Sequence, residues 1–161
     1  MRARVGDSLV QPEMVEECAR LLESGRVEIP TDFVIAREAA TDAETRTVNR
    51  VSIPDGWKGL DIGPGTAAEF GDLIAEARTV FWNGPMGVFE DSRFEAGTRT
   101  VAQAVADCRG FTVVGGGDSA AAVDQFGLAR DIDHISTGGG ASLELLEQGD
   151  LPGLEALRGQ R

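Results

Sequence analysis

The sequence predicts an α/β fold in which a mainly parallel sheet is covered by helices. In the second half of the chain, short apolar stretches alternate with segments of helical periodicity, as in parallel sheets with crossover helices. Glycine-containing turns follow four apolar stretches, after Ile62, Trp82, Val114 and Ser136. Ligands of such folds bind beyond the carboxyl ends of the strands, so we expect all four turns at one edge.

The first half of the chain is less regular. Residues 5–9 look like the end of a strand without a partner, so the fold is expected to be incomplete at its N-terminal side. Apolar residues at helical spacing predict a helix over residues 12–23. Strands are expected within residues 29–36 and, half exposed, over residues 48–53, with a polar turn between them.

The second half follows a simpler order. Residues 59–63 form a short apolar run, and Thr66 is expected to cap a helix that reaches about Ala77. Further strands are expected at residues 79–82, 111–114 and 134–136, and helices at about 94–107, 118–126 and 138–146.

Composition limits the possible partners. The 161 residues carry a formal net charge of −12, which disfavours nucleic acid and anionic membranes but not a nucleotide bound as its magnesium complex. The sequence shows neither an apolar run of membrane-spanning length nor a basic-then-apolar leader, so a cytoplasmic location is expected.

The most informative segment is FTVVGGGDS, residues 111–119. A strand, a glycine turn and a helix start in this order present backbone N–H groups to an anion. Asp118 would repel a bare phosphate unless a divalent cation lay between them, so it indicates a metal-bound phosphate. The alternative is that Asp118 only caps the helix and the glycines only form a tight turn.

The turn NGPMGVFE, residues 83–90, combines an amide, glycines, apolar side chains and one carboxylate. This combination suits a nucleoside, with the base against Val88 and a ribose hydroxyl on Glu90. The alternative is a buried turn with Glu90 in solvent.

The turn STGGGAS, residues 136–142, opens a second helix with no acid nearby. It is the better candidate for stabilising negative charge on a phosphoryl group in transfer. One helix terminus contributes about 1 kcal/mol, whereas enzymatic rate enhancement needs at least about 8 kcal/mol, so metal, positioning and cationic groups must supply the rest. His134 is interpreted as steadying this turn rather than as a general acid or base.

Four motifs carry a family resemblance: VFWNGPMGVFE, VVGGGDSAA, HISTGGGASLELLE and LPGLEAL. Together they closely resemble the C-terminal, nucleotide-binding domain of phosphoglycerate kinase, over about residues 5–157. The resemblance implies a Rossmann-like three-layer sandwich and a monomeric parent. It also implies a glycolytic kinase that transfers a phosphoryl group between 1,3-bisphosphoglycerate and ADP, giving 3-phosphoglycerate and ATP, with Mg²⁺.

The resemblance also implies site residues. The nucleotide would be lined by Gly59 and Leu60 and by residues 83–88, which include Asn83, Gly84, Pro85 and Val88. Glu90 would bind the ribose. Its phosphates would contact Gly116, Gly117 and Ser119, and its magnesium ion would contact Asp118. Gly139 and Gly140 would form the helix N-terminus that stabilises the transferring group.

The family is much longer than this chain. Its N-terminal domain, which binds phosphoglycerate and supplies a catalytic arginine, has no counterpart here, nor do the lysines that reach the nucleotide phosphates; Lys58 cannot replace them by position. Residues 1–161 are therefore expected to be a partial nucleotide-binding domain, inactive alone. The alternatives are a non-catalytic nucleotide-binding module and a fragment that complements a separate N-terminal chain. A dinucleotide-binding dehydrogenase is disfavoured because GGGDS lacks the G-x-G-x-x-G spacing.

Overall fold

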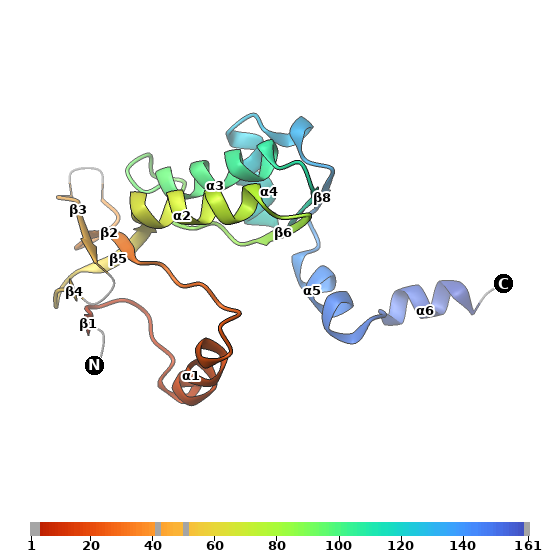
Figure 1. The fold of residues 1–161 in the computed structure, drawn as a ribbon, viewed down its shortest axis with the longest axis horizontal. Coiled ribbons are helices and arrows are strands. Elements are labelled where there is room, and N and C mark those ends of the chain that lie inside the picture. Colours follow the sequence, from red (N-terminus) through yellow and green to blue (C-terminus); the bar gives the residue numbers. More distant parts are fainter. Residues whose placement is uncertain (1–3, 41–42, 50–51, 160–161) are drawn as a thin grey trace. The chain divides into compact units, whose positions relative to one another are not determined.

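The computed structural model describes residues 4–40, 43–49 and 52–159 (Figure 1). The chain divides into two compact units, each of which is described by itself. Unit 1 comprises Met1–Phe70 and Met86–Thr98, and unit 2 comprises Gly71–Pro85 and Arg99–Arg161. Two helices, α2 (Pro64–Ala75) and α3 (Ala96–Asp107), begin in unit 1 and end in unit 2.

Unit 1 contains two small sheets. In the first, β2 (Asp32–Ala36) lies between β3 (Arg46–Asn49) and β5 (Lys58–Ile62) and is antiparallel to both. The second pairs β1 (Arg4–Val5) in parallel with β4 (Ser52–Ile53). The predicted strand end is therefore present only at Val5, since residues 6–9 are not part of a strand, and the expectation that it has no partner was wrong because β1 pairs with β4.

The core of unit 1 forms around Trp57. Ile35, Ile53 and Trp57 are buried together, and Arg37 and Arg46 lie over the Trp57 ring at 5.0 and 4.5 Å from its centroid. These cation–π contacts place the two guanidinium groups over the Trp57 ring.

The predicted N-terminal helix is present. A 3₁₀ turn over Pro12–Met14 leads into α1 (Val15–Glu23), which buries none of its side chains in the described part of the chain. The proline is accommodated because the first N–H groups of a helix have no intrahelical partner.

Unit 2 holds the parallel sheet. Its strand order is β6 (Thr79–Asn83), β7 (Phe111–Gly115) and β8 (His134–Ser136). The chain passes through α3 between the first two strands and through α4 (Gly117–Gln125) between the last two, and α5 (Gly139–Gln148) follows β8. Asn83 pairs with Gly115, and Gly115 pairs with Ser136, so three of the predicted glycine turns leave one edge of this sheet.

The prediction of one mainly parallel sheet was wrong for the first half of the chain. β5 pairs with antiparallel β2, so the turn after Ile62 does not belong to the parallel sheet. A short apolar run does not reveal the direction of its partner strand, which explains the error.

The predicted strand over residues 48–53 is divided between β3 and β4, with residues 50–51 outside the described residues. The sequence also failed to predict α6 (Pro152–Arg158). The three-layer arrangement stays a prediction.

The prediction that Thr66 caps α2 was also wrong. The helix begins at Pro64, and the carboxylate of Asp32 caps it by accepting hydrogen bonds from the N–H groups of Gly65 and Thr66, at 3.0 and 2.7 Å. The Thr66 hydroxyl lies inside the unit, where it accepts the N–H groups of Thr31 and Asp32. The helix thus starts against β2.

Within the described ranges, no helix combines the length and the apolar character needed to cross a membrane.

Candidate functional site

Three turns meet at the carboxyl edge of the parallel sheet in unit 2. The N–H group of Gly116 donates to the carbonyl of Ser136 (2.9 Å), which joins the turn after β7 to the end of β8. The N–H group of Gly84 donates to the hydroxyl of Ser119 (2.6 Å), which joins the turn after β6 to α4. These bonds hold the three predicted ligand-binding turns in one place.

The N-terminus of α4 is open to an anion. Its N-cap residue, Gly116, has φ +93°, a conformation that other residues rarely adopt, and no side chain caps the helix. Within the part of the chain that the structure describes, the N–H groups of Gly117, Asp118 and Ser119 donate to no protein acceptor. Such N–H groups, together with the helix dipole, attract negative charge.

The N-terminus of α5 packs directly against this turn. A Cβ atom on Gly139 would lie 2.7 Å from Cα of Gly116 and 2.8 Å from Oδ1 of Asn83, so only glycine allows this approach. A Cβ atom on Gly140, by contrast, would meet nothing within 4 Å. Two helix N-termini therefore lie side by side, and their partial positive charges reinforce each other.

Asp118 lies in the first turn of α4 with its side chain exposed. It does not cap the helix, because the N-cap position belongs to Gly116 and no side-chain cap bond is formed. Among the residues described here, no group of three His, Cys, Asp or Glu side chains could hold a metal ion. A single carboxylate nevertheless fits magnesium that takes its other ligands from phosphates and water.

Ser119 was expected to contact the nucleotide phosphates, but its side chain is not available for this contact. Its side chain is 1% exposed, and its hydroxyl accepts the N–H group of Gly84. The hydroxyl thus fixes the turn after β6, and the backbone N–H of Ser119 is the group left for an anion.

The remaining predicted residues lie in unit 1. Gly59 and Leu60 are part of β5, and the carbonyl of Leu60 accepts the N–H group of Val88 at 2.9 Å. Val88 is half-buried, whereas the Glu90 side chain is exposed. β5 therefore holds the segment that carries Val88.

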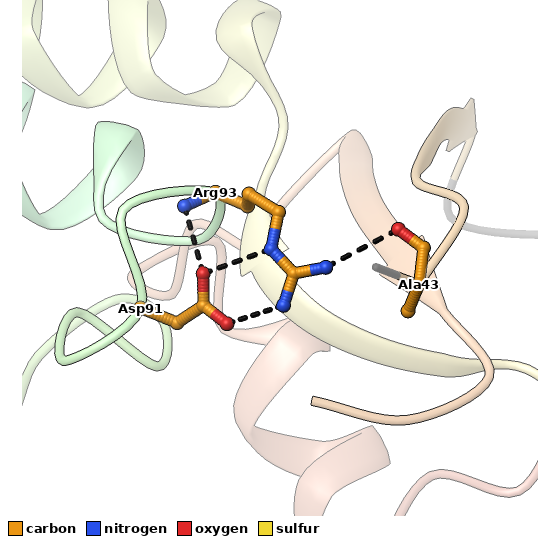
Figure 2. Close-up of polar contacts among 3 residues, drawn as sticks. All are labelled: Ala43, Asp91 and Arg93. Carbon is orange, nitrogen blue, oxygen red and sulfur yellow. Dashed lines mark hydrogen bonds and ion pairs between the residues drawn. The ribbon is translucent and has the colours of Figure 1, made fainter. Parts of the chain in front are cut away.

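A side-chain clamp follows Glu90 (Figure 2). The backbone N–H and Nε of Arg93 donate to Oδ1 of Asp91, at 3.1 and 2.9 Å, and its guanidinium also bonds Oδ2. One guanidinium nitrogen reaches the carbonyl of Ala43 at 3.2 Å. These hydrogen bonds from Arg93 hold the pKa of Asp91 below its usual value. The clamp fixes the turn directly after Glu90.

Two buried polar residues were missed at the sequence level. Asp61 is 3% exposed, and burial raises its pKa to about 6 although the N–H groups of Gly97 and Ile62 donate to it. Thr98 is fully buried at the start of α3. An acid inside the apolar run GLDIG was the one available signal for Asp61.

The predicted residues therefore fall into two groups. Unit 2 brings together the turn residues at its sheet edge: Asn83, Gly84, Pro85, Gly116, Gly117, Asp118, Ser119, Gly139 and Gly140. Unit 1 contains Gly59, Leu60, Val88 and Glu90.

Comparison with known sequences gives a consistent result. The family model described as phosphoglycerate kinase matches residues 1–149. A phosphoglycerate kinase of Parafrankia sp. (strain EAN1pec) is 59% identical over 156 residues, and one of Rhodococcus opacus (strain B4) is 53% identical over 161. These matches cover 95% and 96% of this chain but 39% and 40% of the relatives.

Comparison with solved structures also finds phosphoglycerate kinases. Phosphoglycerate kinase from Coxiella burnetii superimposes with a TM-score of 0.88 at 38% identity, over 95% of this chain and 41% of that chain. The enzyme from Pyrococcus horikoshii OT3 gives a TM-score of 0.79 at 34% identity, over 91% and 36%. The chain thus spans about two fifths of the length of the proteins it resembles.

Proposed function

Because the chain belongs to the phosphoglycerate kinase family, we propose that it is part of the C-terminal, nucleotide-binding domain and binds Mg-ADP or Mg-ATP. The reaction proposed for the whole protein is phosphoryl transfer between 1,3-bisphosphoglycerate and ADP, giving 3-phosphoglycerate and ATP. The observation that best supports this proposal is that the N-termini of α4 and α5 lie next to each other, with the exposed side chain of Asp118 beside them.

The turns of unit 2 suggest a division of roles. The N–H groups of Gly117 and Ser119, with the open turn at Gly116, would receive the nucleotide phosphates. Asp118 would contact the magnesium ion, which neutralises phosphate charge when bound. Gly139 and Gly140 would direct the α5 N-terminus at the transferring group.

Apolar contacts suit the nucleoside. We assign Gly59, Leu60 and Val88 to the base and Glu90 to a ribose hydroxyl, as in the sequence prediction. The half-buried Val88 supports the contact with the base, and the exposed Glu90 carboxylate is accessible to a ribose hydroxyl, as it also would be in the alternative of a buried turn with Glu90 in solvent. Asn83, Gly84 and Pro85 are assigned to the nucleotide as well.

We propose that this chain alone does not complete the transfer. The turn sequences NGPMGV, GGGDS and STGGG contain neither lysine nor arginine. Two helix termini supply about 2 kcal/mol of the at least about 8 kcal/mol that catalysis needs, so cationic groups must come from elsewhere. The phosphoglycerate would be held by parts of the relatives that these residues do not match.

Amide chemical shifts of the labelled chain test the proposal. Adding Mg-ADP should shift the resonances of residues 117–119 and 139–141 selectively, while an assay with 1,3-bisphosphoglycerate shows no turnover. An absence of shifts would contradict nucleotide binding and favour a fragment that only complements another chain. Turnover by the pure chain would contradict the proposed inactivity.

A further inference from the structure

The segment Met86–Val88 turns its backbone donors into unit 1. The N–H groups of Met86 and Gly87 donate to the hydroxyl of Thr98 at 3.0 and 3.1 Å, and that of Val88 donates to the carbonyl of Leu60 at 2.9 Å. Three successive donors are therefore already used. The segment has no N–H group left for a phosphate, in contrast to the turn at Gly117.

A buried carboxylate lies beneath the same segment. Oδ2 of Asp61 accepts the N–H group of Gly97 at 2.8 Å, and Oδ1 accepts that of Ile62 at 2.9 Å. A Cβ atom on Gly87 would lie only 2.4 Å from Oδ1 of Asp61, so the segment passes directly over the carboxylate. Asp61 thus fixes the first turn of α3, which carries Thr98.

We propose that Thr98 and Asp61 are positioning residues that make this chain select a nucleoside diphosphate over bare diphosphate. They hold Met86–Val88 with its donors turned inward, so that its apolar side chains are preorganised for a base. Neither residue touches the ligand in this account. The inference rests on the proposed function, which assigns Val88 to the nucleotide.

A matched threonine gives the control. Thr66 lies in the first turn of α2 as Thr98 does in that of α3, both are fully buried, and each hydroxyl accepts two backbone N–H groups. The donors to Thr66, however, are those of Thr31 and Asp32. Thr66→Val therefore removes a buried hydroxyl that accepts as many N–H groups, and that also bonds the Asp32 carboxylate, without touching Met86–Val88.

Calorimetry with Mg-ADP and with magnesium pyrophosphate tests the proposal. Thr98→Val should weaken Mg-ADP binding about tenfold and leave pyrophosphate binding unchanged. Thr98→Ser, which keeps the hydroxyl, should bind Mg-ADP like the unaltered chain, and Thr66→Val should preserve the ratio of the two affinities. Asp61→Asn offers an independent variant with the same expected selective loss, because a carboxamide has one acceptor oxygen for two donors.

The outcomes separate the two proposals. If the unaltered chain binds Mg-ADP but Thr98→Val and Asp61→Asn weaken both probes equally, or neither, the positioning role is overturned and nucleotide binding stands. If the unaltered chain binds neither probe, the proposed function fails. Amide hydrogen exchange then decides the positioning role: Thr98→Val should accelerate exchange at Met86 and Gly87 while Thr66→Val does not, and equal rates overturn it.

Discussion

The carboxylate of Asp32 bonds both the backbone N–H and the hydroxyl of Thr66, at 2.7 and 2.6 Å, and so ties β2 to the start of α2. Burial alone would raise the pKa of Asp32, but hydrogen bonds from Thr66 and Gly65 outweigh it and hold that pKa below the usual value of 3.8. Capping and strand–helix packing thus depend on one side chain.

Removing this cap should destabilise the chain. Asp32→Ala is expected to lower the free energy of unfolding by about 1 to 2 kcal/mol, as measured by urea denaturation at pH 7. Since the folded-state pKa is lowered, the stabilisation is present above pH 4 and is lost as the pH falls through that pKa. An unchanged unfolding curve for Asp32→Ala would contradict the capping role.

The pH dependence of stability that Asp61 contributes should have the opposite sign to that from Asp32. Burial raises its pKa from 3.8 to about 6, so the folded chain binds this proton more tightly than the unfolded chain does. Stability should therefore fall, by at most about 3 kcal/mol because solvent screening reduces the effect, as the pH rises from about 4 to above 6. Asp61→Asn removes this dependence, so the difference in unfolding free energy between the two proteins should vary with pH across that window. A constant difference would show that Asp61 titrates normally.

The clamp after Glu90 should contribute modestly. Arg93→Ala removes the side-chain hydrogen bonds to Asp91 and Ala43 together with the cation–π contact with Phe94, and is expected to lower the free energy of unfolding more than the control does. The control is Arg20→Ala, which breaks the exposed Arg20–Glu17 pair and should change stability by less than about 0.5 kcal/mol. Equal effects of the two substitutions would mean that the clamp adds nothing specific.

Two neighbouring glycines should respond differently to alanine. In Gly139→Ala the new methyl group would lie 2.7 Å from Cα of Gly116, so α5 must move and Mg-ADP binding should weaken at least tenfold. In Gly140→Ala the methyl group meets no protein atom within 4 Å, so α5 need not move and any loss of affinity should be smaller than for Gly139→Ala. Both variants keep the backbone N–H groups. Equal affinities would argue against the close approach of the two turns.

Local sequence signals predicted unit 2 well. Apolar stretches, glycine turns and helix starts follow one another between Thr79 and Gln148, and each is set by neighbouring residues. The helix α6 could also have been anticipated from Pro152 at its first position, but its seven residues give too short a pattern. The site residues of unit 2 lie in these local turns, which is why a sequence pattern could point to them.

Unit 1 depends on distant partners instead. Asp32 meets Thr66 across 34 residues, and Asp61 meets Gly97 across 36. Neither pair has a periodic or local signature, so a capping threonine was predicted where a distant carboxylate does the capping. The antiparallel pairing of β5 escaped prediction for the same reason.

Calorimetry of the Asp118→Asn variant tests the central claim most directly. If Asp118 contacts nucleotide-bound magnesium, the substitution should weaken Mg-ADP binding about tenfold or more, while binding of ADP in a metal-free chelator solution stays the same or improves. The matched control is Asp124→Asn, which removes an exposed acid from the same helix and should leave both affinities unchanged. An equal loss with and without magnesium, or no loss in either condition, would contradict the account.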